Sequence, residues 1–214
     1  MKYPLIFVVT VLSLLITTHK AIAADEHAIK ILVMGDSLSA AYGIPKELGW
    51  VNLLRETLST RAEVINASIS GETSGGGLAA LPKHLASYNP DIVLLALGAN
   101  DGLRGFPPQT MKSNLEAMII ASRKSGARVL MIGIHILPNY GKRYTEAFYN
   151  VYESLVDEYQ LGFVPFLLDD VALKPELMQD DQLHPTAEAQ PYILSNVLPH
   201  LESELTAIVD EQNR

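Results

Sequence analysis

Short apolar runs recur along this chain, and each of them ends in small or polar residues. A strand that is buried on both faces of a sheet has this character, because a covered parallel sheet leaves no polar face along its strands. The sequence therefore predicts five strands, at residues 29–34, 64–65, 91–97, 129–136 and 162–167.

Between these runs, apolar residues are spaced as on one face of an amphipathic helix, at i, i+3, i+4 and i+7. The clearest stretch runs from Phe148 to Tyr159, and others lie at 50–58, 111–119 and 186–208. We interpret their aromatic and methionine residues as contacts between helix and sheet rather than as cofactor ligands. Because alternating strands and helices favour right-handed crossovers, we expect a three-layer α/β/α sandwich with a five-stranded, mostly parallel sheet.

The amino-terminal segment differs from the rest of the chain. An apolar run from Leu5 to Ile16 is followed by Ala21-Ile22-Ala23, which has the small-x-small form of a signal-peptidase site. We expect a signal peptide of residues 1–23 and one domain at 24–214. A retained membrane anchor is the alternative, but the run is shorter than the ~20 residues that a spanning helix needs. We therefore expect a protein exported to the periplasm or secreted, without stable membrane insertion after cleavage.

Charge and cysteine content exclude several classes of function. The net charge is −8, and without Lys2 and Lys20 the chain keeps 14 basic against 24 acidic residues. We expect no nucleic-acid partner, because neutralising phosphates takes clustered lysine and arginine. The chain has no cysteine, which excludes disulfides, thiolate metal sites and a cysteine nucleophile. We also expect a monomer.

Ser37 follows the first predicted strand, in the segment Gly35-Asp36-Ser37-Leu38. In open α/β sheets, ligands bind beyond the carboxyl ends of the strands. A hydroxyl at a strand-to-helix turn is exposed at this edge, and its own N–H can help to hold an oxyanion. The alternative interpretation is an ordinary serine that caps a helix. The G-x-S-x-G elbow of α/β-hydrolases is absent.

Gly71 and Asn100 follow the second and third predicted strands. A glycine lets its backbone N–H approach a substrate closely, and a carboxamide donates hydrogen bonds to developing negative charge without carrying a charge itself. Each could instead belong to a plain turn. The run Gly75-Gly76-Gly77 fits neither the dinucleotide fingerprint nor the Walker pattern, so we interpret it as a flexible loop or the entry to a helix.

Asp181 and His184 lie three residues apart near the carboxyl end. This spacing allows the carboxylate to accept a hydrogen bond from Nδ1 while Nε2 is left free to take a proton from Ser37. His184 could instead be a surface histidine or half of a metal site. No second histidine is placed to complete such a site, so we expect neither a metal nor another cofactor.

Taken together, these segments resemble the SGNH, or GDSL-type, hydrolases. They are most similar to the bacterial exported subgroup of multifunctional thioesterase I, lysophospholipase and arylesterase enzymes, and the resemblance covers nearly the whole chain after residue 23. One departure is Ala99, where a second glycine is frequent in the family. The segments that carry the resemblance are Gly35–Ser39, Asn66–Ser74, Asn100–Gly105, Asn139–Gly141, Met178–Asp181 and His184-Pro185.

The resemblance implies a flavodoxin-like SGNH hydrolase fold and serine-dependent hydrolysis of esters and thioesters through an acyl-enzyme. It implies Ser37 as the nucleophile, His184 as the base and Asp181 as the carboxylate that orients it. The oxyanion hole would consist of the N–H groups of Ser37 and Gly71 with the Asn100 side chain. The partner would be a small acyl ester, lysophospholipid or acyl thioester.

By the same resemblance, the loops at 103–107 and 136–144 border a hydrophobic substrate groove. We expect Leu103, Phe106, Leu137 and Tyr140 to contribute to it, although each could be an ordinary surface residue. Three other functions stay open: a carbohydrate O-acetyl esterase, a catalytically silent binding protein of the same fold, and a flavodoxin-like nucleotide-binding domain. The last lacks a dinucleotide fingerprint or a Walker lysine after the first strand.

Overall fold

The computed structural model describes residues 28–214, so the signal peptide expected at residues 1–23 lies outside the described part of the chain. It contains the predicted five-stranded sheet, in the order β2-β1-β3-β4-β5. Every neighbouring pair is parallel, which confirms the expectation of a mostly parallel sheet. The strands are β1 (Ile29–Gly35), β2 (Ala62–Asn66), β3 (Ile92–Ala96), β4 (Arg128–Ile132) and β5 (Gly162–Val164).

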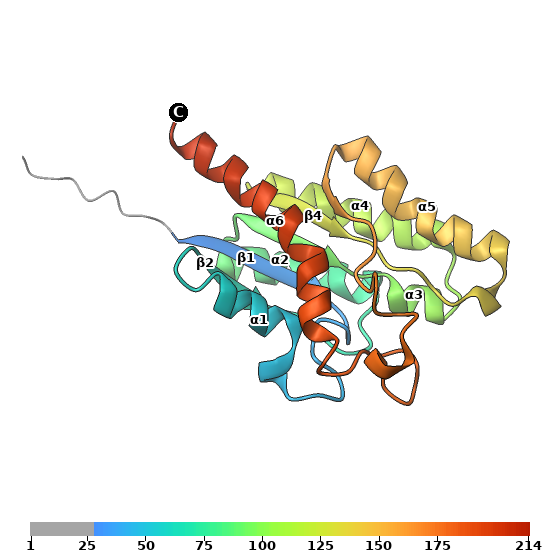
Figure 1. Cartoon of the computed structure of the whole chain (residues 1–214). Coiled ribbons are helices and arrows are strands. Elements are labelled where there is room, and N and C mark those ends of the chain that lie inside the picture. The colour runs from blue at the N-terminus through green and yellow to red at the C-terminus, as the bar shows by residue number, and fades with distance from the viewer. Residues whose placement is uncertain (1–27) are drawn as a thin grey trace, which may run out of the picture.

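Helices cover both faces of this sheet, so the predicted three-layer sandwich is confirmed (Figure 1). On one face α1 packs beside α6, and on the other α4 packs between α2 and α5. The helices are α1 (Trp50–Thr57), α2 (Ser74–Tyr88), α3 (Ala99–Leu103), α4 (Pro108–Lys124), α5 (Lys142–Tyr159) and α6 (Gln190–Gln212), with short 3-10 turns at Lys46–Leu48, Pro138–Tyr140 and Pro175–Leu177.

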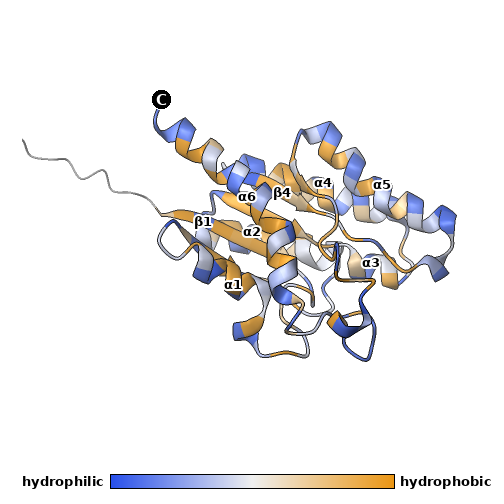
Figure 2. Cartoon of the chain, viewed as in Figure 1, coloured by the Kyte–Doolittle hydropathy of each residue, from blue (hydrophilic) through white to orange (hydrophobic). Residues whose placement is uncertain are grey.

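The core lies between the sheet and the inner faces of the helices. All residues of β3 are buried, as are all of β1 except Lys30. Figure 2 shows the strands as almost uniformly hydrophobic, whereas the helices alternate between hydrophobic and hydrophilic positions. Trp50 of α1 and Tyr152 of α5 are fully buried against opposite faces of the sheet. This is the arrangement that apolar strand runs and helical periodicity require.

Helix α2 was not predicted as a helix, because its composition disfavours one. Glycines occupy its first turn and Pro82 lies inside it, and both residue types have low helix propensity. Tertiary contacts account for it. The backbone N–H of Ser74 donates to Asp101 (2.8 Å), and a Cβ on Gly77 would lie 2.3 Å from Leu97. The glycines let α2 approach the sheet closely, so the interpretation of Gly75–Gly77 as a helix entry is correct.

Two strands end several residues earlier than predicted. β4 ends at Ile132 rather than at residue 136, and β5 ends at Val164 rather than at 167. A Cβ on Gly133 would lie 2.4 Å from the carbonyl oxygen of Pro165, so the segments that follow β4 and β5 lie very close together there. The apolar residues that follow leave the sheet and line a pocket, which explains why an apolar run continues past the end of each strand.

The strand order fixes where a ligand site can form. β1 lies between β2 and β3, so the chain leaves β1 and β3 toward different sides of the sheet. At such a switch point the loops diverge and open a crevice beyond the carboxyl ends of the strands. Ser37 follows β1 and Asn100 follows β3, which places both residues at this crevice.

Candidate active site

Ser37 lies in a series of turns directly after β1. The backbone N–H of Ala40 donates to the Asp36 carbonyl (2.9 Å), and that of Tyr42 donates to the Ser37 carbonyl (3.2 Å). No α-helix lies between β1 and α1, which begins at Trp50. The alternative interpretation of Ser37 as a helix cap is therefore wrong, as is the expected direct turn from strand to helix. The hydroxyl is held by turns and is half-buried.

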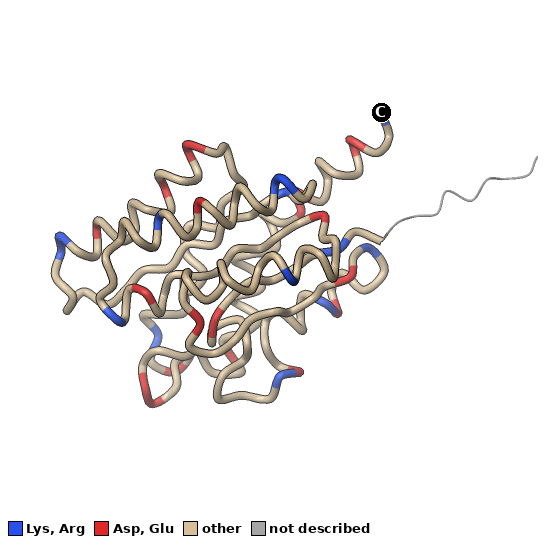
Figure 3. Tube along the Cα trace, turned by 180° about the vertical axis from the view of Figure 1, so that it is seen from behind, with Lys and Arg blue, Asp and Glu red and all other residues tan. Residues whose placement is uncertain are grey.

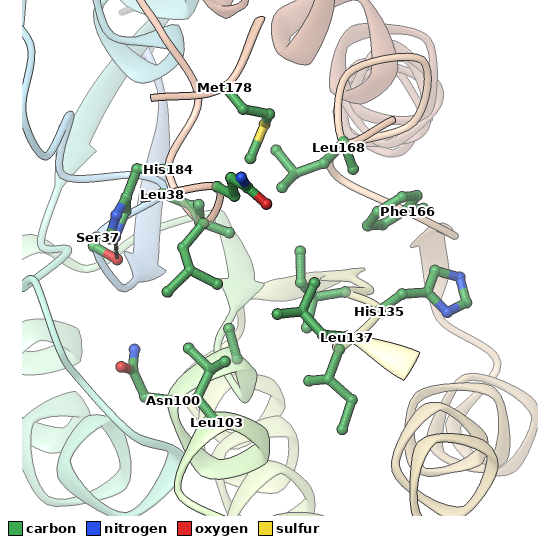
Figure 4. A pocket seen from close by; sticks show the side chains of 16 residues that line it. Ser37, Leu38, Asn100, Leu103, His135, Leu137, Phe166, Leu168, Met178 and His184 are labelled. Carbon is green, nitrogen blue, oxygen red and sulfur yellow. Dashed lines mark hydrogen bonds between the residues drawn. The ribbon is translucent and has the colours of Figure 1, made fainter. Parts of the chain in front are cut away.

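Ser37, His184 and Asp181 form a continuous chain of hydrogen-bonding contacts (Figure 4 shows the Ser37 and His184 side chains). The Oγ of Ser37 lies 2.9 Å from Nε2 of His184, and Nδ1 of His184 lies 2.6 Å from Oδ2 of Asp181. The serine and the histidine are 147 positions apart in sequence, so only the fold brings them together. The spacing argument for Asp181 and His184 agrees with this geometry.

The loop that carries His184 is closed on itself. The backbone N–H of Gln179 donates to the His184 carbonyl (2.7 Å). The Oδ1 atom of Asp181 accepts the backbone N–H groups of Leu183 and His184, each at 3.0 Å. On the outer side, the Tyr42 ring packs against the imidazole with centroids 4.4 Å apart. These contacts fix the direction in which Nε2 points.

The Asp181 carboxylate is held in its charged form. Partial burial alone would raise its pKa, but the hydrogen bonds from the His184 ring and from two backbone N–H groups outweigh burial and lower the pKa to about 2. An ionised carboxylate can only accept, so Nδ1 of His184 carries the proton. Nε2 is then free to accept the Ser37 proton.

Asn100 reaches the same crevice from the first turn of α3. It is preceded by Gly98, whose φ of +124° only glycine adopts easily and where a Cβ would lie 2.3 Å from the Tyr152 hydroxyl. The Nδ2 of Asn100 donates to Oδ2 of Asp36 at 3.2 Å. Asn100 lines the same pocket as Ser37 and His184.

Gly71 lies in the loop after β2 with a φ of +80° and is not among the pocket-lining residues. Two contacts tie this loop to α3. Arg104 donates from Nη2 to the Gly71 carbonyl (2.9 Å), and the buried carboxylate of Asp101 accepts the N–H (2.8 Å) and the hydroxyl (2.5 Å) of Ser74. The Gly71 loop and the Asn100 turn are therefore held as one unit.

An apolar pocket extends from Ser37 and His184 toward Phe166 and His135 (Figure 4). It encloses about 640 Å³ of empty space, open solvent at its mouth included. Its polar lining is confined to a few side chains, and most of it is apolar: Leu38, Ala99, Leu103, Ile134, Ile136, Leu137, Phe166, Leu168, Ala172, Met178 and Leu183.

Of the four residues expected to border the groove, Leu103 and Leu137 line this pocket, whereas Phe106 and Tyr140 do not. Tyr140 contacts a residue that lines the pocket, because its hydroxyl donates a hydrogen bond to the Leu103 carbonyl (2.7 Å). The Phe106 carbonyl accepts the hydroxyl of Tyr144 (2.7 Å) while its ring is exposed. Sequence position identified the loop but could not tell which of its side chains turn inward.

Several pocket residues lie just after β4 and β5, and sequence reasoning missed most of them. Ile134, His135 and Ile136 follow β4, and Phe166 and Leu168 follow β5. Ile134, His135 and Phe166 were interpreted as the ends of longer strands, whereas Ile136 also fell within the loop expected to border the groove. Figure 4 places His135 at the end of the pocket remote from Ser37. Its ring stacks on Tyr149 with centroids 4.0 Å apart, and burial lowers its pKa.

Within residues 28–214, no helix combines the length and the apolar character that crossing a membrane requires. Nor do three or more histidine, aspartate or glutamate side chains gather there as they would around a metal ion.

The amino-acid sequence is similar to those of known esterases and thioesterases. The chain is 50% identical to an arylesterase from Vibrio mimicus, over 86% of this chain and 93% of the relative. It is 45% identical to the esterase TesA of Pseudomonas aeruginosa (89% and 94%). It is 43% identical to thioesterase 1/protease 1/lysophospholipase L1 of Escherichia coli K12 (85% and 86%).

Solved structures of related esterases have the same fold as this chain. A crystal structure of TesA superimposes with a TM-score of 0.79 at 46% identity, covering 82% of this chain and 99% of that one. A structure of the psychrotrophic esterase EstA from Pseudoalteromonas sp. gives 0.79 at 43% identity, covering 83% and 98%. The family profile itself matches residues 33–190, which contain every element of the site described above, and the chain therefore belongs to the GDSL-like lipase/acylhydrolase family.

Proposed function

We propose that this protein hydrolyses carboxylic esters and thioesters, with Ser37 as the nucleophile. The observation that carries the proposal is the chain of contacts from Ser37 Oγ to His184 Nε2 (2.9 Å) and from His184 Nδ1 to Asp181 (2.6 Å). Nucleophile, base and orienting group within hydrogen-bond reach are the signature of acyl transfer through a covalent intermediate. The relatives include an arylesterase, an esterase and a thioesterase/lysophospholipase, which supports the same chemistry.

The reaction proceeds in two steps. Ser37 Oγ attacks the acyl carbonyl while His184 takes its proton, and His184 then returns this proton to the departing alcohol or thiol. Asp181 stabilises the imidazolium that forms in between. A water molecule, deprotonated by His184, attacks the acyl-enzyme and releases the acid. In both steps the oxyanion accepts hydrogen bonds from the N–H groups of Ser37 and Gly71 and from Asn100.

The apolar pocket is the acyl-binding site in this proposal. Its lining offers contact along its length and few hydrogen-bond partners, which suits a hydrocarbon chain better than a sugar. The favoured substrates are therefore acyl esters, acyl thioesters and lysophospholipids rather than O-acetylated carbohydrates.

The nucleophile can be tested directly. Wild type and Ser37→Ala are compared on p-nitrophenyl acyl esters, a lysophospholipid and an acyl thioester, and the variant is expected to lose turnover by about 10⁴-fold or more. Because EstA was crystallised inhibited by monoethylphosphonate, a phosphonate ester is a suitable covalent probe, and mass spectrometry should find it on Ser37. Wild-type rates in Ser37→Ala, or labelling elsewhere, would refute the proposal.

The acyl-binding site can be tested with a matched pair of exposed apolar residues. Leu137 lines the pocket, whereas Phe106 of the neighbouring loop does not. Leu137→Ala should change the chain-length preference across a C4 to C16 series of p-nitrophenyl esters. Phe106→Ala should leave it unchanged. The same change in both variants, or in neither, would contradict the pocket assignment.

We also propose export to the periplasm, with cleavage after Ala23, and a monomeric mature protein without a nucleic-acid partner. The net charge of −8 supports the last point, as does the dispersal of lysine and arginine among acidic residues along the trace (Figure 3). Amino-terminal sequencing of the protein from a periplasmic extract should begin at Ala24, and light scattering should give the monomer mass.

A further inference from the structure

The proposed mechanism leaves one buried charged group of the site without a role. Asp36 immediately precedes Ser37 and is 2% exposed. Its Oδ1 accepts the backbone N–H of Leu38 (3.0 Å), and its Oδ2 accepts Nδ2 of Asn100 (3.2 Å). Within residues 28–214, no lysine or arginine forms an ion pair with it. Both partners of this buried carboxylate are thus neutral donors.

Such a placement is unfavourable for the folded state by itself. Taking a carboxylate out of water without a cation disfavours its charged form, and burial raises the pKa of Asp36 to about 6 despite both hydrogen bonds. A neutral side chain of the same shape would avoid this cost. The position is therefore better explained by what the carboxylate does to its neighbour than by what it adds to stability.

That neighbour is the carboxamide of Asn100, which has two possible orientations. A carboxylate only accepts hydrogen bonds, so it selects the orientation in which Nδ2 faces it and disfavours the flipped one, in which two oxygens would meet. Nδ2 carries two hydrogens. When one of them is bound to Asp36, the plane of the amide is fixed and the other hydrogen has a defined direction.

We propose that Asp36 is a positioning residue, which orients the Asn100 carboxamide so that its second N–H donates to the oxyanion formed at the Ser37 acyl group. This inference rests on the proposed function. It assigns Asp36 no contact with the substrate and no proton transfer. The proposed contribution of Asp36 to catalysis passes through Asn100. Because Asp36 also accepts the Leu38 N–H and its charge acts on His184, the part that Asn100 carries has to be measured separately.

A double-mutant cycle tests this pathway, using Asp36→Asn, Asn100→Ala and the two combined on a p-nitrophenyl ester. Losing one oxyanion donor costs about 10²–10³-fold in turnover. Asp36→Asn should lower kcat by roughly 10–100-fold, part of that cost, with KM changed less than about threefold. In the Asn100→Ala background, Asp36→Asn should change kcat by less than about twofold, because the group on which it acts is gone.

Two measurements separate positioning from a structural role. The Tm of Asp36→Asn at pH 7 should equal or exceed that of wild type, since the variant removes a buried charge, whereas a structural role predicts a lower Tm. If Asp36→Asn does not fold, Asp36→Ala enters the same cycle. Because alanine also removes the acceptor of the Leu38 N–H, only the part of its loss of kcat that disappears in the Asn100→Ala background is assigned to Asn100.

Three outcomes would overturn the inference: wild-type kcat in Asp36→Asn, an equal loss of kcat in both backgrounds, or a loss of kcat that tracks a lowered Tm. Each is distinguishable from failure of the proposed function. That failure would appear as activity in Ser37→Ala, which the inference on Asp36 does not affect.

Discussion

Two carboxylates flank the candidate site, and their surroundings shift them in opposite directions. Asp36 in the loop after β1 is buried, and burial raises its pKa to about 6. Asp181 in the loop before α6 is 40% exposed at its side chain, and hydrogen bonds from His184 and two backbone N–H groups lower its pKa to about 2. The same functional group is thus held differently on the two sides of Ser37.

The difference shows what decides the state of a carboxylate in this fold. Asp181 has an imidazole and two N–H groups directed at it while water still reaches it, so its charge is stabilised from several sides. Asp36 has two neutral donors and little water. A pair of groups whose pKa values are pushed apart is characteristic of active sites. Here the exposed member holds a permanent charge and the buried one orients a neighbour.

Between these two carboxylates, the largest expected effect concerns the charge on Asp181. Asp181→Asn should lower kcat by about 10³–10⁴-fold, because an amide favours the wrong tautomer of His184 and does not stabilise the imidazolium. Hydrolysis of p-nitrophenyl esters at pH 8 measures it, with circular dichroism as the check on folding. A loss of less than tenfold would mean that His184 is oriented mainly by Tyr42 and its own loop.

The second prediction concerns stability against pH. The pKa of Asp36 is about 6 in the folded state against its ordinary value of 3.8, so the folded state binds this proton more tightly. Its favourable contribution is fully present below pH 4 and is lost as pH rises through 6. From pH 4 to pH 7, wild type should lose roughly 2 kcal/mol of unfolding free energy relative to Asp36→Asn.

Asp181 provides the control with the opposite sign. Its pKa is lowered in the folded state, so its contribution is present above pH 4 and is lost as pH falls toward 2. Urea unfolding of wild type and both variants across pH 2–8 compares them. Curves for Asp36→Asn and wild type that run parallel from pH 4 to 7 would show that Asp36 is not held as described.

The smallest expected effect comes from Tyr42, whose ring packs on His184 at 4.4 Å. An aromatic contact of this kind is worth about 0.5–1.5 kcal/mol, so Tyr42→Ala should lower kcat roughly 2–10-fold. Tyr88→Ala is a matched control, because that exposed ring stacks on His84 of α2, outside the pocket. Equal kcat values for the two variants would mean that Asp181, and not Tyr42, orients His184.

Local patterns were sufficient for most of the fold. The apolar runs located all five strands, because a strand buried on both faces must be apolar along its length. Periodicity located α1, α4, α5 and α6, whose inner faces meet the sheet. It failed at α2, where glycines and Pro82 weaken the local signal and contacts with Asp101 and Leu97 supply the stability.

In the candidate site, too, local patterns predicted some features and failed to predict others. Ser37, Gly71, Asn100, Asp181 and His184 were each proposed as site residues from residue type and from a place after a strand or in the last loop. The orientation of side chains around them was not. Leu137 lines the pocket and Phe106 does not, and a loop has no periodicity from which this could be predicted.

The sequence by itself determined the layered α/β/α fold, the edge of the sheet where the site lies and the residue types that carry its chemistry. These follow from apolar periodicity and from the position of each residue along the chain, which are local properties. Only the tertiary structure decided that Ser37 and His184 meet at 2.9 Å and that Asp36 is buried against Asn100. Distances and burial depend on how residues far apart in sequence pack together, and a local pattern carries no record of that.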